Sequence, residues 1–317
     1  MTPQDQQPLH SGFDATTDAD GVLDGVDLHG KVVLVTGGSS GLGAETVAAL
    51  ARAGASVIAP VRSAGSVTPA EGVREVPGLD LGDLGAVAAT AETVRGMTEH
   101  LDAVIAAAGI MATPLQRIGP GWESQFTVNH LGHFALLTRL YPLLAARGAR
   151  VVTYSSAGHH LSDVHWEDLH FLRGYDKWQA YGQSKTATSL LAVGLDRRGR
   201  EDGVRAFAVH PGGILTGLQR HLPREEQVAL GWVDEHGEIA AEGFKSPSQG
   251  AATGLWAATS PQLEGRGGLY LEDCDVARVA TGGRAVDGGV APYAVDPNAA
   301  EQLWRLSAAM TASDLPA

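Results

Sequence analysis

VVLVTGGSSGLG, residues 32–43, is the stretch of this sequence that decides the fold. Its first four residues form a short apolar run, which is typical of a strand buried on both faces. A helix is expected to follow from Leu42 to Ala53, because Gly54 stops the pattern there. The glycines between the two elements permit a tight turn and let backbone N–H groups reach an anion at the positive end of the helix. The stretch therefore predicts a strand, a turn suited to a phosphate group, and a helix.

The same alternation of apolar runs and helical segments continues along the chain. We expect further strands at 55–60, 101–107, 150–155, 204–209 and 268–271, and further helices at 123–146, 178–198, 248–259 and 298–310. Alternating strands and helices indicate an α/β fold with a single doubly wound parallel sheet covered by helices on both faces. We place this domain at 30–317, after an acidic arm at 1–29 that lacks apolar periodicity and is expected to be flexible or draped over the surface.

The composition points to a small-molecule partner. The chain has 317 residues, 44% of them hydrophobic, and a formal net charge of -13. An acidic protein meets nucleic acids and anionic membranes with repulsion, so we expect neither as a partner. Cys274 is the only cysteine and cannot form an intrachain disulfide. The first thirty residues contain no Lys or Arg to begin a signal or transit peptide, and we expect a cytoplasmic protein.

The glycine turn has a distinctive spacing, Gly-x-x-x-Gly-x-Gly after Thr36, which resembles the cofactor turn of the short-chain dehydrogenase/reductase family. Other landmarks of that family follow in the right order, and the resemblance covers the chain from about Leu28 to Leu306. These landmarks are Asp80-Leu81, Ala107-Ala108-Gly109, Asn129, Ser155-Ser156, Tyr181-x-x-x-Lys185, Pro211-Gly212 and Thr216. Within the family, the chain is similar to a bacterial branch that resembles retinol dehydrogenases.

This resemblance implies a Rossmann-type fold that binds a nicotinamide dinucleotide. Asp80 is expected to hydrogen-bond the adenine amino group, and Gly109 to let the chain pass under the ribose. The turn at 211–216 is expected to hold the nicotinamide carboxamide and its phosphate. The complete set of expected cofactor-binding residues is Thr36, Gly37, Ser39, Ser40, Gly41, Leu42, Gly43, Arg62, Asp80, Leu81, Ala107, Ala108, Gly109, Tyr181, Lys185, Pro211, Gly212, Ile214 and Thr216.

The end of the second strand bears on the choice between NADP and NAD. A carboxylate at this place accepts hydrogen bonds from the ribose 2′-hydroxyl and would repel a 2′-phosphate. The sequence here reads APVR at 59–62, with no acid. Arg62 could pair with the phosphate, so we predict NADP over NAD. A lone Arg on a surface turn can also be merely solvated, which keeps NAD open.

The candidate catalytic residues are Asn129, Ser156, Tyr181 and Lys185. Tyr181 and Lys185 are four residues apart on an expected helix, so both project from one face. A phenol has an ordinary pKa of about 10, and we expect the nearby ammonium to lower it so that Tyr181 acts as general acid and base. The resemblance implies that Lys185 also holds the nicotinamide ribose, that Ser156 rather than Ser155 binds the substrate oxygen, and that Asn129 binds a water of a proton relay.

The chain departs from the family pattern in two places. The turn at 106–109 reads AAAG where the family has Asn-Asn-Ala-Gly, which removes a side chain that braces neighbouring strands. The segment 156–181 is long and holds four histidines among acids without metal-ligand spacing, so we predict no metal. Its expected role is to pack over the active site, with His159 a candidate substrate contact.

The segment 217–245 is expected to be a substrate loop that closes over bound ligand. Its apolar residues predict a pocket wall for a moderately apolar ketone, aldehyde or secondary alcohol, although they could simply anchor the loop. These residues are Leu218, Leu222, Val228, Leu230 and Trp232.

Together these features predict an NADP-dependent oxidoreductase that moves a hydride between nicotinamide and a carbonyl or alcohol. The alternative is a catalytically silent, dinucleotide-binding regulator or scaffold with the same fold. A third possibility is that the same groups catalyse an epimerisation, a dehydration or another lyase-like reaction in which the bound cofactor is retained and not consumed. By resemblance, the helices at 123–146 and 178–198 form a homodimer or homotetramer surface.

Overall fold

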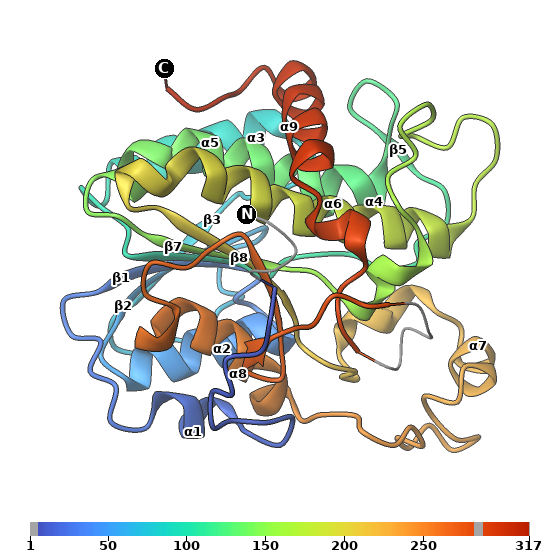
Figure 1. Cartoon of the computed structure of the whole chain (residues 1–317), viewed down its shortest axis with the longest axis horizontal. Coiled ribbons are helices and arrows are strands. Elements are labelled where there is room, and N and C mark those ends of the chain that lie inside the picture. Colours follow the sequence, from blue (N-terminus) through green and yellow to red (C-terminus); the bar gives the residue numbers. More distant parts are fainter. Residues whose placement is uncertain (1–5, 282–287, 317) are drawn as a thin grey trace.

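An eight-stranded sheet forms the centre of the computed structural model, which describes residues 6–281 and 288–316 (Figure 1). The strand order is β10-β9-β8-β7-β4-β1-β2-β3, and all neighbouring strands are parallel except the β9–β10 pair. The strands are β1 (Val32–Thr36), β2 (Ser56–Val61), β3 (Val73–Pro77), β4 (Ala103–Ala106), β7 (Arg150–Tyr154), β8 (Arg205–His210), β9 (Leu269–Glu272) and β10 (Asp275–Val276). The predicted fold class, a doubly wound α/β sheet, is confirmed.

Helices cover both faces of this sheet (Figure 1). α3, α5, α6 and α9 lie on one face and α1, α2 and α8 on the other. The helices are α1 (Ala19–Leu23), α2 (Gly41–Arg52), α3 (Leu84–Arg95), α4 (Ser124–Phe126), α5 (Gly132–Ala145), α6 (Lys177–Gly199), α7 (Arg224–Ala229), α8 (Pro247–Thr259) and α9 (Pro297–Thr311). Each face buries its own apolar core, with Phe134 and Leu190 in one and Leu50 and Trp256 in the other. None of the described helices is long and apolar enough to cross a membrane.

Short elements connect the main ones. Arg117–Ile118 (β5) and Trp122–Glu123 (β6) form a small antiparallel hairpin. The 3-10 turns are η3 (Ala157–Leu161), η4 (Arg200–Asp202), η5 (Gly217–His221), η6 (Pro261–Leu263) and η8 (Pro292–Val295).

The strand order reverses its direction between β1 and β4. From β1 the chain winds outward to β2 and β3, and from β4 it winds the other way to β7, β8 and β9. The carboxyl ends of β1 and β4 lie side by side, with Thr36 in register with Ala106. In an open α/β sheet a ligand crevice forms at such a reversal, which is where the turn 37–43 lies.

The long helix predicted at 123–146 is interrupted, and this prediction is corrected. A π-helical turn, η2 (Thr127–Leu131), separates α4 from α5, and the N–H of Gly132 bonds to the carbonyl of Thr127 five residues earlier. Such a turn inserts an extra residue into a helix, so periodicity over the whole segment cannot reveal it. Asn129 lies in this turn.

The amino-terminal arm contains a helix that the sequence did not predict. Ala19, Val22 and Leu23 of α1 are buried, and the Ala19 N–H donates to the Ser248 hydroxyl on α8 at 3.2 Å. Five helical residues are too few for apolar periodicity to be recognised. Residues 1–5 of the arm lie outside the described residues.

Candidate active site

A cleft opens at the carboxyl ends of β1, β2 and β4 and collects most of the predicted cofactor-binding residues. Those that line it are Gly37, Ser39, Ser40, Gly41, Leu42, Gly43, Arg62, Asp80, Leu81, Ala107, Ala108, Gly109 and Thr216. The sequence analysis missed further lining residues: Pro60, Val61, Leu79, Ile110, Val128, Gly217, Leu218 and Arg220. Arg220 follows Thr216 in the short 3-10 turn 217–221, within a loop whose sequence shows no pattern that would direct its side chain into the cleft.

The glycines of the turn fit a bound pyrophosphate. Gly37 has φ +76° and lies so close to the next strand end that a Cβ there would be 2.9 Å from the Ala108 Cα. A Cβ on Gly43 would be 2.2 Å from the Gly37 carbonyl oxygen. Ser40, the N-cap of α2, makes no side-chain capping bond, so the first N–H groups of the helix remain available to an anion. The cleft thus offers the backbone donors that a dinucleotide needs.

Thr36 lies beneath this cleft and supports the turn at 106–109. Its hydroxyl accepts a hydrogen bond from the Ala108 N–H at 3.2 Å and bonds to His133 Nε2 at 3.0 Å. His133 Nδ1 lies 3.1 Å from the carbonyl of Asn129. A carbonyl only accepts, so Nδ1 carries the proton and Nε2 accepts from Thr36. This chain of bonds braces the AAAG turn, in which the family's bracing Asn is absent.

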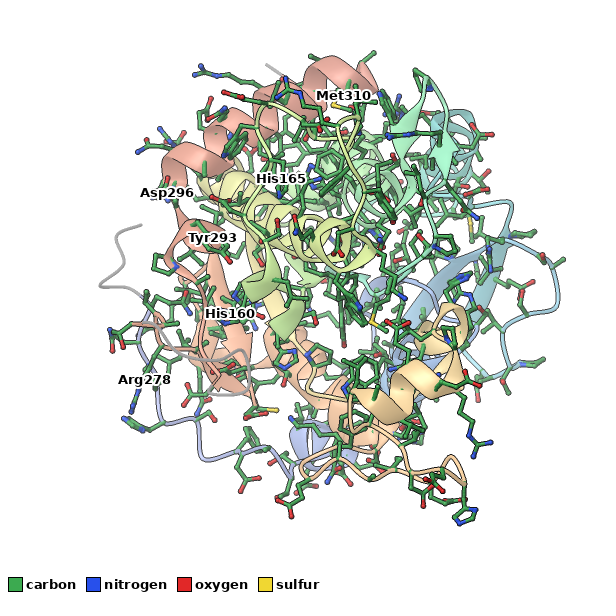
Figure 2. All side chains as sticks on the ribbon, turned by 90° about the vertical axis from the view of Figure 1, so that its right-hand side faces the viewer. His160, His165, Arg278, Tyr293, Asp296 and Met310 are labelled. Atoms are coloured by element: carbon green, nitrogen blue, oxygen red, sulfur yellow. The ribbon has the colours of Figure 1, made fainter. Side chains whose placement is uncertain are left out.

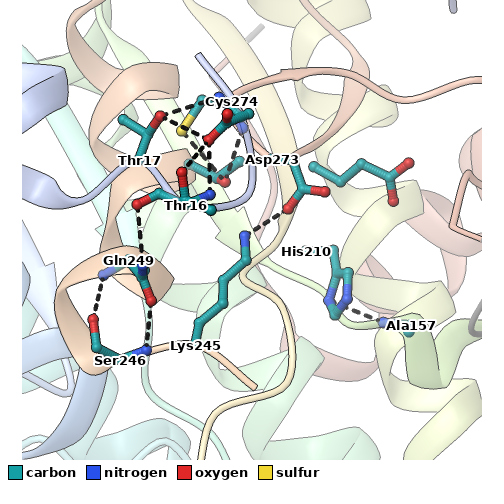
Figure 3. A network of polar contacts seen from close by, with 12 residues as sticks. Thr16, Thr17, Ala157, His210, Lys245, Ser246, Gln249, Asp273 and Cys274 are labelled. Carbon is teal, nitrogen blue, oxygen red and sulfur yellow. Dashed lines mark hydrogen bonds and ion pairs between the residues drawn. The ribbon is translucent and has the colours of Figure 1, made fainter. Parts of the chain in front are cut away.

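The turn at 211–214 is packed behind the cleft. Gly212 has φ +95°, and a Cβ there would meet the Lys245 side chain at 2.7 Å. Lys245 Nζ donates to the Asp273 carboxylate at 2.5 Å (Figure 3). Ile214 is buried and lies against Gly250 of α8, where a Cβ would approach it to 2.9 Å. Pro211, Gly212 and Ile214 therefore lie outside the set of residues that line the cleft.

Thr216 faces the start of α2 across the cleft. A Cβ on Gly41 would lie 3.4 Å from the Thr216 Cβ. The Thr216 hydroxyl caps η5 by accepting from the Leu218 N–H at 3.2 Å. The cap fixes the point at which the chain leaves the cleft and enters the loop 217–245.

Tyr181 and Lys185 come together on α6, as their spacing predicted. The helix begins where the Asp176 carboxylate accepts from two backbone N–H groups of its first turn. Both side chains are buried, and Lys185 Nζ lies 5.6 Å from the centroid of the Tyr181 ring. Lys185 donates its hydrogen bond to the Tyr154 carbonyl at 2.7 Å.

Burial controls the pKa of both groups. It raises the pKa of Tyr181 to about 12, an effect that a hydrogen bond with Ser156 opposes in part. It lowers the pKa of Lys185 to about 8. The expected lowering of the Tyr181 pKa is therefore wrong for this structure, because desolvation of the phenolate is the largest cause of the shift and raises the pKa. The phenol is neutral at physiological pH and can serve as a proton donor.

The two adjacent serines have different surroundings. The Ser155 hydroxyl donates to the Lys185 carbonyl at 2.9 Å and accepts from Ser189 at 2.8 Å, so it is used inside the core. The Ser156 hydroxyl accepts from the Gly158 N–H at 3.0 Å, and it lies on the Tyr181 side of Gly158, where an added Cβ would be 3.4 Å from the hydroxyl oxygen. A Cβ on Gly158 would lie 2.6 Å from the Tyr181 ring, so only glycine leaves the ring room there. Of the two hydroxyls, that of Ser156 lies beside the phenol.

Asn129 lies between the cleft and the Tyr181/Lys185 pair. Its side-chain oxygen accepts from the Ile110 N–H at 2.9 Å, and its amide donates to the Ile110 carbonyl and to Ser184, each at 2.9 Å. A Cβ on Gly109 would lie 3.1 Å from Asn129 Oδ1 and 3.8 Å from Lys185 Nζ. The side chain thus fixes the chain at 109–110 next to the ammonium, while its part in a proton relay stays a prediction.

The histidine-rich segment packs against the rest of the domain. His159 is fully buried and both of its ring nitrogens bond to protein groups, so the predicted substrate contact is wrong. His160 bonds to the Gly289 carbonyl and His165 to the Ser162 hydroxyl. Figure 2 shows where these two histidines lie. Over 6–281 and 288–316, no three His, Cys, Asp or Glu side chains form a group that could hold a metal ion.

An apolar wall adjoins the phenol. Tyr181 packs with Met111, Ala112 and Leu222, and Trp178, Leu218 and Trp232 lie against this cluster. Trp178 makes edge contacts with Tyr181 and with Trp232, at ring-centroid distances of 6.4 and 6.0 Å. Val228 and Leu230, predicted to join the wall, lie outside the cluster, and Leu230 is 43% exposed.

Comparisons with known proteins define the class. Residues 31–227 match the family model described as short chain dehydrogenase. The chain belongs to this family of oxidoreductases, whose members bind a nicotinamide dinucleotide and act on small molecules.

Individual relatives show which members of the family the chain is similar to. The chain is 46% identical to a protein named probable oxidoreductase from Streptomyces lividans over 295 residues, 89% of this chain and 98% of the relative. It is 33% identical to human retinol dehydrogenase 14 over 306 residues, 89% and 87% of the two chains. A crystal structure of an uncharacterized protein from Mycobacterium paratuberculosis covers 92% of this chain and 97% of its own, with 32% identity and a TM-score of 0.67. The predicted likeness to retinol dehydrogenases is confirmed.

Proposed function

We propose that the protein is an NADP-dependent oxidoreductase that interconverts a carbonyl and an alcohol, with Tyr181 as the general acid and base. This proposal rests on one observation: Tyr181, Ser156 and Lys185 lie close together at the end of the cleft that is formed by Gly109. A protein that only bound the dinucleotide would have no use for a buried phenol beside a serine hydroxyl.

The bound dinucleotide supplies or accepts the hydride. In reduction, Tyr181 gives its proton to the carbonyl oxygen, so that hydride and proton together make the alcohol. Ser156 donates a hydrogen bond to the same oxygen and stabilises the negative charge that grows on it. Lys185 provides positive charge next to the phenolate that remains, and Asn129 holds the chain between the ammonium and the cleft. In oxidation the same groups act in reverse.

Two arginines support NADP over NAD. Arg62 and Arg220 both line the cleft and are exposed, and neither forms a salt bridge within the described part of the chain. We assign the 2′-phosphate to Arg62, which directly follows β2, since a bidentate guanidinium suits a phosphate. Arg220 lies on the Thr216 side, where the cleft faces the α2 amino terminus, and we assign it to the bridging phosphates.

The wall of Met111, Leu222, Trp178 and Trp232 favours an apolar substrate. These side chains lie beside Tyr181 and offer no charge to a polar substrate. We propose a moderately apolar ketone, aldehyde or secondary alcohol.

The test is nicotinamide absorbance with a panel of aldehydes, ketones and alcohols, run with NADP(H) and with NAD(H). Native protein is expected to turn over an apolar member with NADP(H), and Tyr181→Phe to lose at least about a thousandfold in kcat, because the phenol proton is gone. Binding of NADPH, followed by quenching of tryptophan fluorescence, is the control and should change little. Binding without turnover across the panel would favour the dinucleotide-binding regulator, and turnover without net use of cofactor would favour an epimerase or lyase.

A further inference from the structure

His159 holds the backbone of the serine that the proposed reaction uses. It lies in η3, three residues after Ser156, and its Nδ1 is 2.6 Å from the Ser156 carbonyl oxygen. On the other side of the ring, Nε2 is 3.0 Å from the Ala291 N–H. An amide N–H only donates, so Nε2 accepts, and the ring proton must be on Nδ1, where it points at Ser156. The protein thus fixes the tautomer of this histidine.

The surroundings hold the ring in a single position. Tyr270 of β9 packs against it with a ring-centroid distance of 4.9 Å, and the Tyr270 hydroxyl lies 3.2 Å from Nδ1. The His159 carbonyl accepts from the Tyr293 hydroxyl at 2.8 Å and from Thr186 of α6 at 3.3 Å. Figure 2 shows the side of the molecule on which Tyr293 and the neighbouring His160 lie. Burial lowers the pKa of His159 to about 3, so the ring is neutral.

We propose that His159 is a positioning residue for Ser156. Its Nδ1–H fixes the Ser156 carbonyl, which sets the direction in which the Ser156 hydroxyl leaves the chain toward Tyr181. Its Nε2 ties this arrangement to the segment at 288–295, so the carboxyl-terminal part of the chain supports the active site without touching the substrate. Errors of about 1 Å in the placement of a catalytic group can lower the rate on the order of a hundredfold. By holding Ser156 in place, His159 would prevent such a loss. The inference rests on the proposed function.

A matched pair of variants separates the two ring nitrogens. In His159→Asn the side-chain amide can take the place of Nδ1 and donate to the Ser156 carbonyl. In His159→Gln the side-chain amide reaches the Nε2 position next to Ala291 and leaves the Ser156 carbonyl without its donor. We expect Asn to keep kcat within about tenfold of native and Gln to lose roughly a hundredfold, with KM and NADPH affinity within about threefold in both. Tyr293→Phe removes a bond to the His159 backbone but not to its ring, and should keep kcat close to native.

Equal losses of kcat in the Asn and Gln variants, or a smaller loss in Gln, would overturn the proposal, as would a rise of KM at constant kcat. Melting temperatures identify a variant that merely fails to fold. Nitrogen-15 NMR of the native protein adds a readout that needs no turnover: a neutral ring with the proton on Nδ1 is expected, and a proton on Nε2 would overturn the proposal. Native protein that shows this tautomer but reduces no carbonyl would instead count against the proposed function.

Discussion

Lys185 lies 5.6 Å from the centre of the Tyr181 ring, but its ammonium donates to the Tyr154 carbonyl. Each of the two groups is buried, and burial disfavours the charged form of each. At neutral pH the Tyr181 phenol is therefore uncharged, and the Lys185 amine titrates near pH 8. A neutral phenol is better suited to donate a proton than to accept one.

The rates of the two directions should depend differently on pH. Alcohol oxidation needs the phenolate, and since the pKa of Tyr181 is about 12, its fraction rises with pH throughout the neutral range. The rate of oxidation should rise by as much as about tenfold per pH unit. The rate of carbonyl reduction should not fall through titration of Tyr181 over the same range, because the phenol stays protonated. Single-turnover rates between about pH 6 and pH 9 test this. A plateau in oxidation near pH 7 would show that the phenolate is already formed.

Lys185 should make stability depend on pH. Its folded-state pKa is about 8, below the ordinary 10.5, so between these values the unfolded chain binds more protons than the folded one. Stability therefore rises with pH across this window, by up to about 3 kcal/mol relative to Lys185→Met, which has no group to titrate. Urea unfolding of both proteins at pH values across the window measures the difference. If the difference in free energy of unfolding between the two proteins did not change with pH, the lowered pKa of Lys185 would be contradicted.

Gly37→Ala should abolish dinucleotide binding. The new methyl would lie 2.9 Å from the Ala108 backbone, so the turn would have to move. Gly65→Ala is the matched control, because Gly65 has nearly the same φ, +74° against +76°, and open space around its Cβ position. Both variants carry the cost of a left-handed residue with a Cβ, about 1–2 kcal/mol. If Gly65→Ala weakened NADPH binding as much in a fluorescence titration, backbone strain rather than the collision would be responsible.

The two cleft arginines should affect the two cofactors differently. Arg62→Ala is expected to weaken NADPH about tenfold and NADH little, because only NADPH carries the 2′-phosphate. Arg220→Ala is expected to weaken both by a similar factor, because both contain the bridging phosphates. Dissociation constants from fluorescence titration provide the measurement. An Arg62 variant that loses affinity equally for both would remove the argument for NADP.

Glu226 connects the loop 217–245 to the start of α6. Its carboxylate accepts from Lys177 Nζ at 2.5 Å and from Trp178 Nε1 at 3.1 Å at the start of α6. Glu226→Gln should raise KM for an apolar substrate up to about fivefold and hasten proteolysis of 217–245, since a partly exposed ion pair contributes up to about 1 kcal/mol. Glu225→Gln makes the same change of charge at a residue outside these contacts. Similar effects of both variants would point to net charge instead of the tether.

The sheet, most of the residues that line the cleft and the Tyr181/Lys185 pair could be predicted from the sequence, because each of them follows from a local pattern. It could not show the π-helical turn around Asn129, because this segment is buried on nearly all sides and has no single apolar face whose shift would mark an extra residue. The Tyr181 pKa and the burial of His159 depend on distant segments that cover them. Arg220 was missed because it lies in the loop, where no pattern gives a direction to a side chain.

The packing of α1 has a practical consequence for anyone who produces this protein. The composition of the first thirty residues invites their removal to obtain a shorter, more crystallisable chain. Such a truncation would strip Val22 and Leu23 from the face that they cover and break the Arg52–Asp20 pair to α2, the helix whose amino terminus faces the cleft. A shortened protein would then lose cofactor affinity along with solubility, so an inactive truncated preparation would say nothing about the enzyme itself.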